Sequence, residues 1–115
     1  MILVIGAMAS GKRSYVRSLG FAEHEIADGV LDDRPVVANA HRLAADYAGT
    51  MDELADKLSE KAVVICNEVG CGLVPVQAEQ REQRERAGRL CALLAARADR
   101  VVRMVCGIPQ LIKER

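Results

Sequence analysis

Aromatic side chains are scarce in this 115-residue sequence, which has no Trp, one Phe and two Tyr although half of its residues are hydrophobic. Its core must therefore be built from Ala, Val, Leu and Ile, a composition that suits helices packed on a mostly parallel sheet. Net charge is also lacking, because 16 basic and 16 acidic residues cancel. Without a basic field, or basic runs interleaved with aromatics, we expect no nucleic-acid partner and no attraction to an acidic membrane.

Long hydrophobic runs and paired cysteines are absent as well. No apolar run approaches the roughly 18 residues of a membrane span, and the apolar start at residues 1–5 is too short for a signal peptide. The cysteines form no C-x-x-C pair, so we predict no zinc site and no metal-binding residues; they are Cys66, Cys71, Cys91 and Cys106. Cys66 and Cys106 lie in apolar, strand-like runs, where we expect buried, reduced thiols and hence a cytoplasmic protein.

The remaining pattern is an alternation of strand-like and helical segments in one domain, residues 1–115. Apolar strands are predicted at residues 1–5, 35–39, 62–66 and 101–106, with a short strand at 110–113 and at best one more within 24–29. Helices are predicted at residues 10–19, about 41–47, 50–60 behind a Thr50–Glu53 capping box, and 77–98. This alternation predicts an α/β fold, a P-loop NTPase-like three-layer α/β/α arrangement with a mostly parallel sheet of about five strands.

The first strand leads into G-x-x-x-x-G-K, which runs from Gly6 to Lys12. In this pattern, backbone N–H groups at a helix start surround a polyphosphate and the lysine reaches its β- and γ-phosphates. The alternative is an ordinary strand–helix turn with a surface lysine. The buried strand before the motif and the apolar helix after it favour phosphate binding. We therefore predict that GTP or ATP is bound by Gly6, Ala7, Met8, Ala9, Ser10, Gly11, Lys12, Arg13 and Ser14.

The last motif position normally carries a hydroxyl that binds Mg²⁺, but here it is Arg13. Ser14 is rotated about 100° further round the helix, so it does not simply replace that hydroxyl. Two orientations of Arg13 stay open, toward phosphate or, the favoured one, toward solvent. We expect Mg²⁺ only if the protein is catalytic.

A second motif, N-E-V-G-C-G-L-V-P at residues 67–75, follows the 62–66 strand. It resembles the N-E-V-G-x-G-[IL]-V-P signature of the bifunctional adenosylcobinamide kinase/adenosylcobinamide-phosphate guanylyltransferase family, which acts late in cobalamin synthesis and salvage. The resemblance extends over more than half of the chain, through residues 2–12, Arg84, 87–89, 94–99 and 101–109. It implies transfer of phosphoryl or nucleotidyl groups from ATP or GTP to adenosylcobinamide, and assembly as a homo-oligomer.

The sequence departs from the family pattern at two further places. The resemblance puts Asn39 where the family has an acidic residue associated with Mg²⁺, and we predict that Asn39 lies at the nucleotide. The family's guanylylated histidine precedes an R-P pair, whereas Arg34-Pro35 has no histidine at the matching offset. His41 is either its replacement or, the favoured interpretation, a helix-start histidine near the strand edge.

Acidic residues near the same sheet edge are the other candidates for chemistry. Glu68 follows a buried strand, where a carboxylate either accepts a substrate proton or positions a metal, or caps the following loop. With Lys12 it is our predicted catalytic residue. Asp28, Asp32 and Asp33 form an acidic cluster in which one residue replaces the missing metal ligand or, the favoured interpretation, all three belong to a solvated turn. Gly70 and Gly72 are expected to allow positive φ or close backbone approach.

Three functions are compatible with these features. The leading hypothesis is an adenosylcobinamide kinase-like phosphotransferase. The second is a non-catalytic nucleotide-binding or regulatory protein that has lost its Mg²⁺ site and guanylylation histidine. The third, a scaffold that only oligomerises, leaves Lys12 without a purpose and ranks last.

Overall fold

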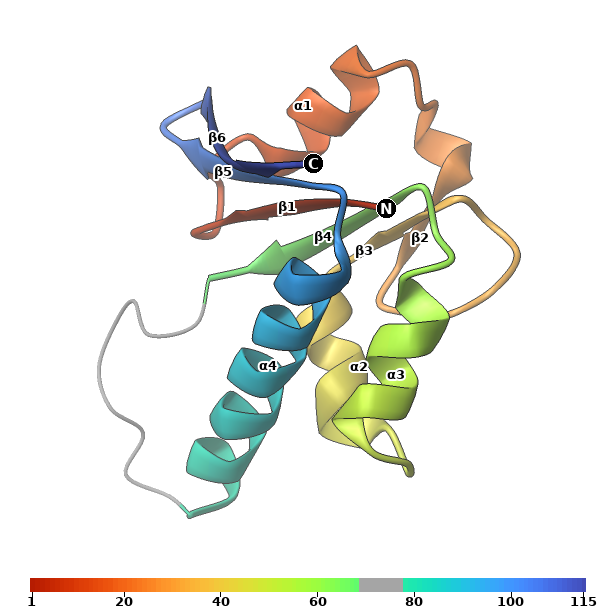
Figure 1. Ribbon diagram of the computed structural model, residues 1–115, viewed down its shortest axis with the longest axis vertical. Helices are drawn as coiled ribbons and strands as arrows, with labels where there is room; N and C mark the ends of the chain where they lie inside the picture. Colours follow the sequence, from red (N-terminus) through yellow and green to blue (C-terminus); the bar gives the residue numbers. More distant parts are fainter. Residues whose placement is uncertain (69–77) are drawn as a thin grey trace.

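The computed structural model describes residues 1–68 and 78–115, in which strands and helices alternate along the chain (Figure 1). Each predicted helix and strand is present, with ends within about two residues of the expected ones. In chain order, the elements are β1 (Ile2–Gly6), α1 (Lys12–Ser18), the 3-10 helix η1 (Glu23–Glu25), β2 (Ile26–Asp28), β3 (Val36–Ala38), α2 (Ala40–Asp46), α3 (Met51–Leu58), β4 (Val63–Asn67), α4 (Ala78–Arg97), β5 (Arg100–Val105) and β6 (Ile108–Glu114).

The strands form a single sheet in the order β2-β3-β4-β1-β5-β6. Neighbouring strands are parallel except β5 and β6, which form an antiparallel hairpin. β1 lies between β4 and β5, with Leu3 in register with Val64 on one side and Val101 on the other. Because parallel strands end at the same edge of a sheet, the segments that follow β1, β2, β3 and β4 meet there.

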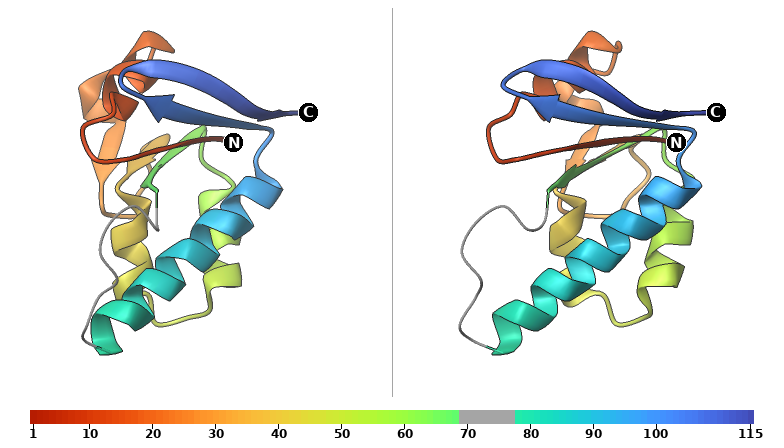
Figure 2. Two further views of the ribbon diagram at one scale, coloured as in Figure 1. Left: turned by 90° about the vertical axis from the view of Figure 1, so that its left-hand side faces the viewer. Right: turned by 60° about the vertical axis from the view of Figure 1, so that its left-hand side comes forward.

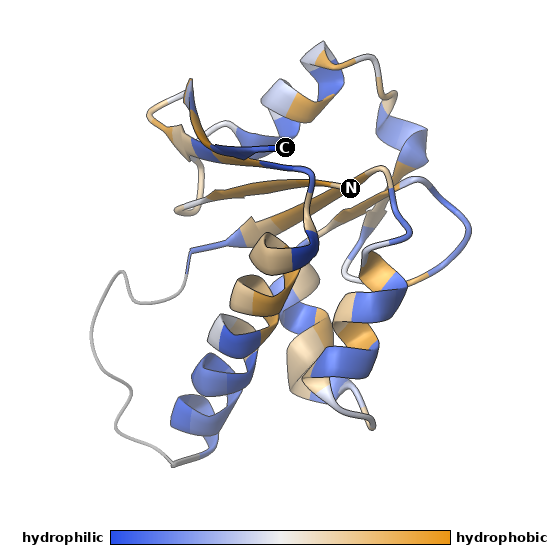
Figure 3. Cartoon of the chain, viewed as in Figure 1, coloured by the Kyte–Doolittle hydropathy of each residue, from blue (hydrophilic) through white to orange (hydrophobic). Residues whose placement is uncertain are grey.

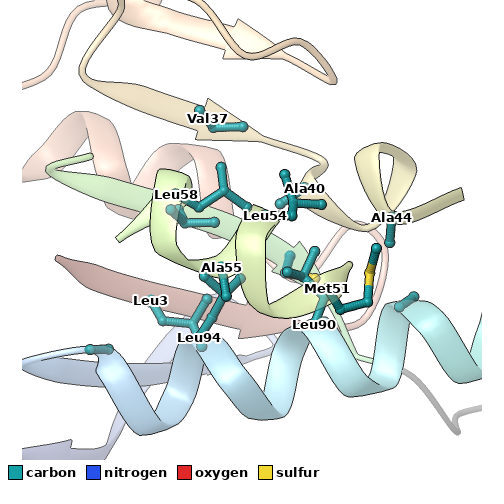
Figure 4. Packing of buried hydrophobic residues seen from close by; sticks show 14 of the residues in the cluster. Leu3, Val37, Ala40, Ala44, Met51, Leu54, Ala55, Leu58, Leu90 and Leu94 are labelled. Atoms are coloured by element: carbon teal, nitrogen blue, oxygen red, sulfur yellow. The ribbon is translucent and has the colours of Figure 1, made fainter. Parts of the chain in front are cut away.

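Helices cover both faces of the sheet, since successive strand residues point to opposite sides. Figure 2 shows α1 on one side of the sheet and α3 and α4 on the other. Leu3, Leu54 and Leu94 belong to the buried cluster beneath α2, α3 and α4 (Figure 4), whereas Val4 and Val16 belong to a second cluster beneath α1. The predicted three-layer α/β/α fold is confirmed, with a sheet of six strands, because the short segment β2 joins it.

Helix α4 packs on the sheet through its second half only. Ala87, Leu90 and Leu94 are buried at helical spacing, while residues 79–83 are exposed. Figure 3 shows the same change from hydrophilic to hydrophobic along α4. The second half of α4 thus carries the buried apolar face. Across residues 1–68 and 78–115, no helix combines the length and the apolar character that crossing a bilayer requires.

Local signals account for the element ends. The capping box of α3 is confirmed, because the Glu53 backbone N–H donates to Thr50 Oγ1 at 3.1 Å and the Thr50 N–H donates to the Glu53 carboxylate at 3.4 Å. Cys106 and Gly107, with φ of 50° and 77°, make the two-residue turn between β5 and β6, a geometry typical of tight hairpins. The prediction that Cys106 is buried is therefore wrong: β5 ends one residue earlier and Cys106 is exposed, whereas Cys66 is buried as expected.

Candidate functional site

The segment between β1 and α1 is a tight loop in which the two motif glycines are required. Gly11 has φ of 93°, in the left-handed region, and its backbone lies close to that of Gly107, so that a Cβ would be 3.2 Å from the Gly107 Cα. A Cβ on Gly6 would lie 2.5 Å from Ser10 Oγ and 2.8 Å from the Met104 carbonyl oxygen. A side chain at either position would therefore disturb the loop.

Lys12 lies inside this loop, with only 8% of its surface exposed. Its ammonium Nζ donates to the carbonyl oxygens of Gly6 at 3.1 Å and Ala7 at 2.6 Å, and it lies 3.4 Å from Ser10 Oγ. Burial lowers the pKa of Lys12, while the nearby Cys66 and Glu68 act in the opposite direction. The loop thus wraps around its own cation.

A cavity of about 480 Å³ adjoins the loop at the ends of β3 and β4. Three cationic side chains line it, those of Lys12, Arg13 and Arg42, and none of its lining residues is acidic. Its remaining lining residues are Met8, Ala9, Ser10, Gly11, Ser14, Ala38, Asn39, Ile65 and Asn67. Eight residues predicted to bind nucleotide thus line one cavity, whereas Gly6 and Ala7 do not line it. Their binding roles stay predictions.

Arg13 is directed toward two carboxylates, an arrangement that neither sequence alternative described. Its Nε lies 3.3 Å from Glu23 in η1, and its NH1 lies 3.5 Å from the Asp28 Oδ2 at the end of β2. Asp28 also accepts a hydrogen bond from the Asn39 side-chain amide at 2.5 Å and lies 3.8 Å from Arg42 NH1. The Asn39 hydrogen bond is the main cause that lowers the pKa of Asp28, and Arg13 and Arg42 lower it further.

This network leaves Mg²⁺ without suitable protein ligands. Mg²⁺ prefers carboxylate and other oxygen ligands at about 2.1 Å, but Asp28 has one oxygen beside Asn39 and Arg42 and the other beside Arg13. Within residues 1–68 and 78–115, no group of three or more His, Cys, Asp or Glu side chains could hold a metal ion. Residues 69–77 contain no Asp, Glu or His. The described residues therefore do not fit Mg²⁺.

The other two acidic candidates, Asp32 and Asp33, lie in the turn before β3. The Asp32 carboxylate accepts hydrogen bonds from the Arg34 backbone N–H at 2.9 Å and from its NH2 at 2.7 Å. Exposed turn carboxylates of this kind match the favoured interpretation. Asp28, by contrast, lies beside the candidate site, at the end of β2.

Glu68 lies on the other side of the loop. Its backbone N–H donates to the Gly6 carbonyl at 2.9 Å, and its carboxylate, 19% exposed, contacts Arg103 at 2.5 Å and 3.2 Å. Both side chains line a second cavity of about 260 Å³, together with loop residues 7–10. The structure thus places Glu68 against the loop, held by an arginine of β5, and its catalytic role stays a prediction.

His41 occupies the first turn of α2, next to the end of β4, as the favoured interpretation expected. Its Nδ1 accepts a hydrogen bond from the Asn67 backbone N–H at 3.3 Å. Burial lowers the pKa of His41, and Arg42 and Lys12 lower it further. The hydrogen bond joins α2 to Asn67, the last residue of β4 and the first of the second motif. Most of that motif, including Gly70 and Gly72, lies outside the described residues.

Three residues at this edge were missed or misplaced by sequence reasoning. Arg42 and Arg103 were given no role, and Asp28 was grouped with the turn acids Asp32 and Asp33. The signal for Arg42 was its place three residues after Asn39, in the first turn of the helix that follows β3. Arg103 carried no local signal, because its proximity to Glu68 depends on the order of strands in the sheet.

Comparison with known proteins identifies a family for this chain. The family model described as cobinamide kinase / cobinamide phosphate guanyltransferase matches residues 28–112, about three quarters of the chain. The matched span includes Asp28, Asn39, His41 and Glu68 and begins after the Gly6–Lys12 loop. A search of curated proteins found no match.

Proposed function

Because the chain belongs to the cobinamide kinase / cobinamide phosphate guanyltransferase family, a family of cobalamin biosynthesis with nucleotide substrates, we propose that it binds the polyphosphate of ATP or GTP at the Gly6–Lys12 loop. In the family's reaction, the γ-phosphoryl group would pass to the hydroxyl of a cobinamide. Adenosylcobinamide is the acceptor we propose. Lys12 would hold the phosphates, and Glu68 is the candidate to receive the acceptor's proton.

The observation that carries this proposal is the position of Lys12. A buried ammonium held by two backbone carbonyls within hydrogen-bond distance costs more than an exposed lysine would. A desolvation cost of this kind is typical of residues that bind a ligand. The cationic cavity beside it is of a size that accommodates a nucleotide-sized ligand.

A second candidate function is nucleotide binding without catalysis, as in a regulatory protein. The observation that favours it is the pairing of Asp28 with Arg13, Arg42 and Asn39. These contacts occupy the carboxylate that lies between the two arginines of the cavity, so the charge that Mg²⁺ supplies in most phosphoryl transfers would be lacking.

Turnover separates the two candidates. We would incubate the protein with adenosylcobinamide and ATP or GTP labelled at the γ-phosphate, with Lys12→Ala as the inactive control. Label on the cobinamide, lost in the variant, supports the kinase. Nucleotide binding without transfer supports the regulator, and absence of both transfer and binding contradicts the proposal.

We also propose that the protein is a cytoplasmic homo-oligomer. The hairpin of β5 and β6 presents Val105, Ile108, Leu111 and Ile112 to solvent, and an apolar edge strand is a common self-association surface. Cys66, Cys91 and Cys106 are free thiols, which suits a reducing compartment. Sedimentation equilibrium would measure the assembly, and a monomer at all concentrations would contradict it.

A further inference from the structure

The cavity beside the Gly6–Lys12 loop is lined by positive charge, which suits an anion that has no metal ion bound to it. We infer that this protein binds the nucleotide polyphosphate without a divalent cation, and that Arg42 provides a phosphate contact in place of the metal. The inference rests on the proposed function, because it concerns how the same site holds the same ligand.

The first support is the set of charges around the cavity. Lys12, Arg13 and Arg42 line it, and the carboxylates that pair with the two arginines, Glu23 and Asp28, lie outside the lining. A polyphosphate carries more negative charge without Mg²⁺ than with it, so a site with three cations favours the free form. A bound Mg²⁺ would instead add a fourth cationic group, and close like charges repel strongly in a partly buried site.

The second support is the state of the oxygen atoms that a metal would need. Asp28 is the carboxylate that contacts both arginines, and each of its oxygens faces a guanidinium or amide group. The Ser10 hydroxyl lies 3.4 Å from the Lys12 ammonium, which leaves Ser14 as the one other hydroxyl in the lining. A single hydroxyl is a poor substitute for the carboxylate that usually anchors Mg²⁺.

The third support is the geometry of Arg42, which is anchored at its base and exposed at its tip. Its backbone N–H donates to the Asn39 carbonyl at 3.0 Å, in the first turn of α2. The side chain is 65% exposed, and its NH1 lies 3.8 Å from Asp28. Such a side chain can turn from a weak, exposed ion pair to a phosphate oxygen, with which its planar guanidinium makes paired hydrogen bonds.

The test is calorimetric titration of the full chain with GTP and with ATP, in EDTA and in excess MgCl₂. We expect the nucleotide affinity in EDTA to equal or exceed that in MgCl₂. A loss of affinity in EDTA of up to about threefold is still consistent with the inference. A greater loss of affinity in EDTA would overturn the inference while leaving the proposed function intact. Absence of binding in both buffers would overturn the proposed function and this inference with it.

Variants test the role of Arg42 itself. Arg42→Ala should weaken GTP binding in EDTA at least about tenfold, the effect of losing one charge-assisted contact. The control is Arg89→Ala, which removes an exposed arginine paired with Asp52 and should leave affinity unchanged. Equal affinity of Arg42→Ala and wild type would contradict the contact. Both arginines are exposed, so circular dichroism should show folded variants.

A second variant restores the metal site that the inference says is missing. Arg13→Thr combined with Asn39→Asp supplies a hydroxyl and a carboxylate, and Asp tolerates the left-handed backbone of Asn39, where φ is 55°. This double variant should bind GTP at least tenfold tighter in MgCl₂ than in EDTA. If it shows the same metal response as wild type, these two positions do not set metal dependence and the inference fails.

Discussion

The Arg13 guanidinium lies 3.5 Å from the Asp28 carboxylate, and this pair links the start of α1 to the end of β2. Arg13 stands where the phosphate-loop pattern normally has a hydroxyl, and Asp28 is an acidic residue at the end of β2 that contacts both Arg13 and Arg42. Arg13 therefore both replaces the metal-binding hydroxyl and neutralises a carboxylate that could otherwise bind a metal. The Arg13–Asp28 contact therefore accounts for both the missing hydroxyl and the unavailable carboxylate.

Substitution of the first motif glycine should damage both stability and binding. In Gly6→Ala, the new Cβ would lie 2.5 Å from Ser10 Oγ and 2.8 Å from the Met104 carbonyl oxygen, so the loop must shift. We expect a loss of about 1–3 kcal/mol in the free energy of unfolding and at least tenfold weaker nucleotide binding. Urea denaturation and calorimetry would measure the two effects.

Gly20→Ala is the matched control for that experiment. Gly20 has φ of 107° but no atom within 4 Å of a Cβ, and it follows the C-terminal end of α1. We expect a stability loss of about 1 kcal/mol from backbone strain and no change in nucleotide affinity. Wild-type affinity in Gly6→Ala would show that the tight loop is not needed for binding.

The fold was predictable because its signals are local and repeated. Continuous apolar runs such as residues 62–66 predict strands buried on both faces, and the spacing of Leu90 and Leu94 predicts the buried face of α4. Cys106 was misplaced because a strand end depends on one backbone turn, and the apolar run continues in sequence beyond the point where pairing stops. Periodicity alone does not locate that point.

Glu68 and Arg103 should be strongly coupled. Their contact of 2.5 Å is only partly exposed, with Glu68 at 19%, so solvent screens it less than a surface pair. A double-mutant cycle with Glu68→Gln and Arg103→Met should give a coupling energy of about 1 kcal/mol or more in urea unfolding. The pair Arg100–Glu114, an exposed contact of 3.4 Å, should give less than about 0.5 kcal/mol. Equal coupling in the two pairs would contradict this assignment.

Protonation of His41 should make the protein less stable in mild acid. Burial, Arg42 and Lys12 lower its pKa in the folded state below the ordinary value of 6.5. Between the lowered and the ordinary pKa, the unfolded chain binds more protons, so stability is full above pH 6.5 and decreases as pH falls through this window. The slope from this one group cannot exceed about 1.4 kcal/mol per pH unit.

Urea unfolding between pH 5 and 8 would measure that slope. His41→Asn keeps a hydrogen-bond acceptor near the Asn67 N–H and removes the titration, so its profile should be flatter than that of wild type. His24→Asn, which changes an exposed histidine of η1, should retain the wild-type slope. A His41→Asn profile parallel to wild type would exclude His41 as the source.

The candidate site was only partly predictable, for a physical reason. The loop from Gly6 to Lys12 is contiguous, so its glycines and lysine were identified from spacing. The contacts Arg13–Asp28 and Glu68–Arg103 join residues 15 and 35 positions apart. These contacts depend on which strands are neighbours and on how the side chains are oriented at the sheet edge. A local sequence pattern predicts neither.

The central claim is that Lys12 and its loop hold the polyphosphate of a nucleotide, and calorimetric titration of ATP and GTP tests it most directly. Wild type should bind at least one of them, and Lys12→Ala should weaken that binding at least tenfold, since a charge-assisted contact contributes about 1.5–3 kcal/mol. Lys57→Ala, which removes a lysine stacked on Tyr47 at 5.2 Å, should bind as wild type does. No binding by wild type, in EDTA and in MgCl₂ alike, would contradict the account.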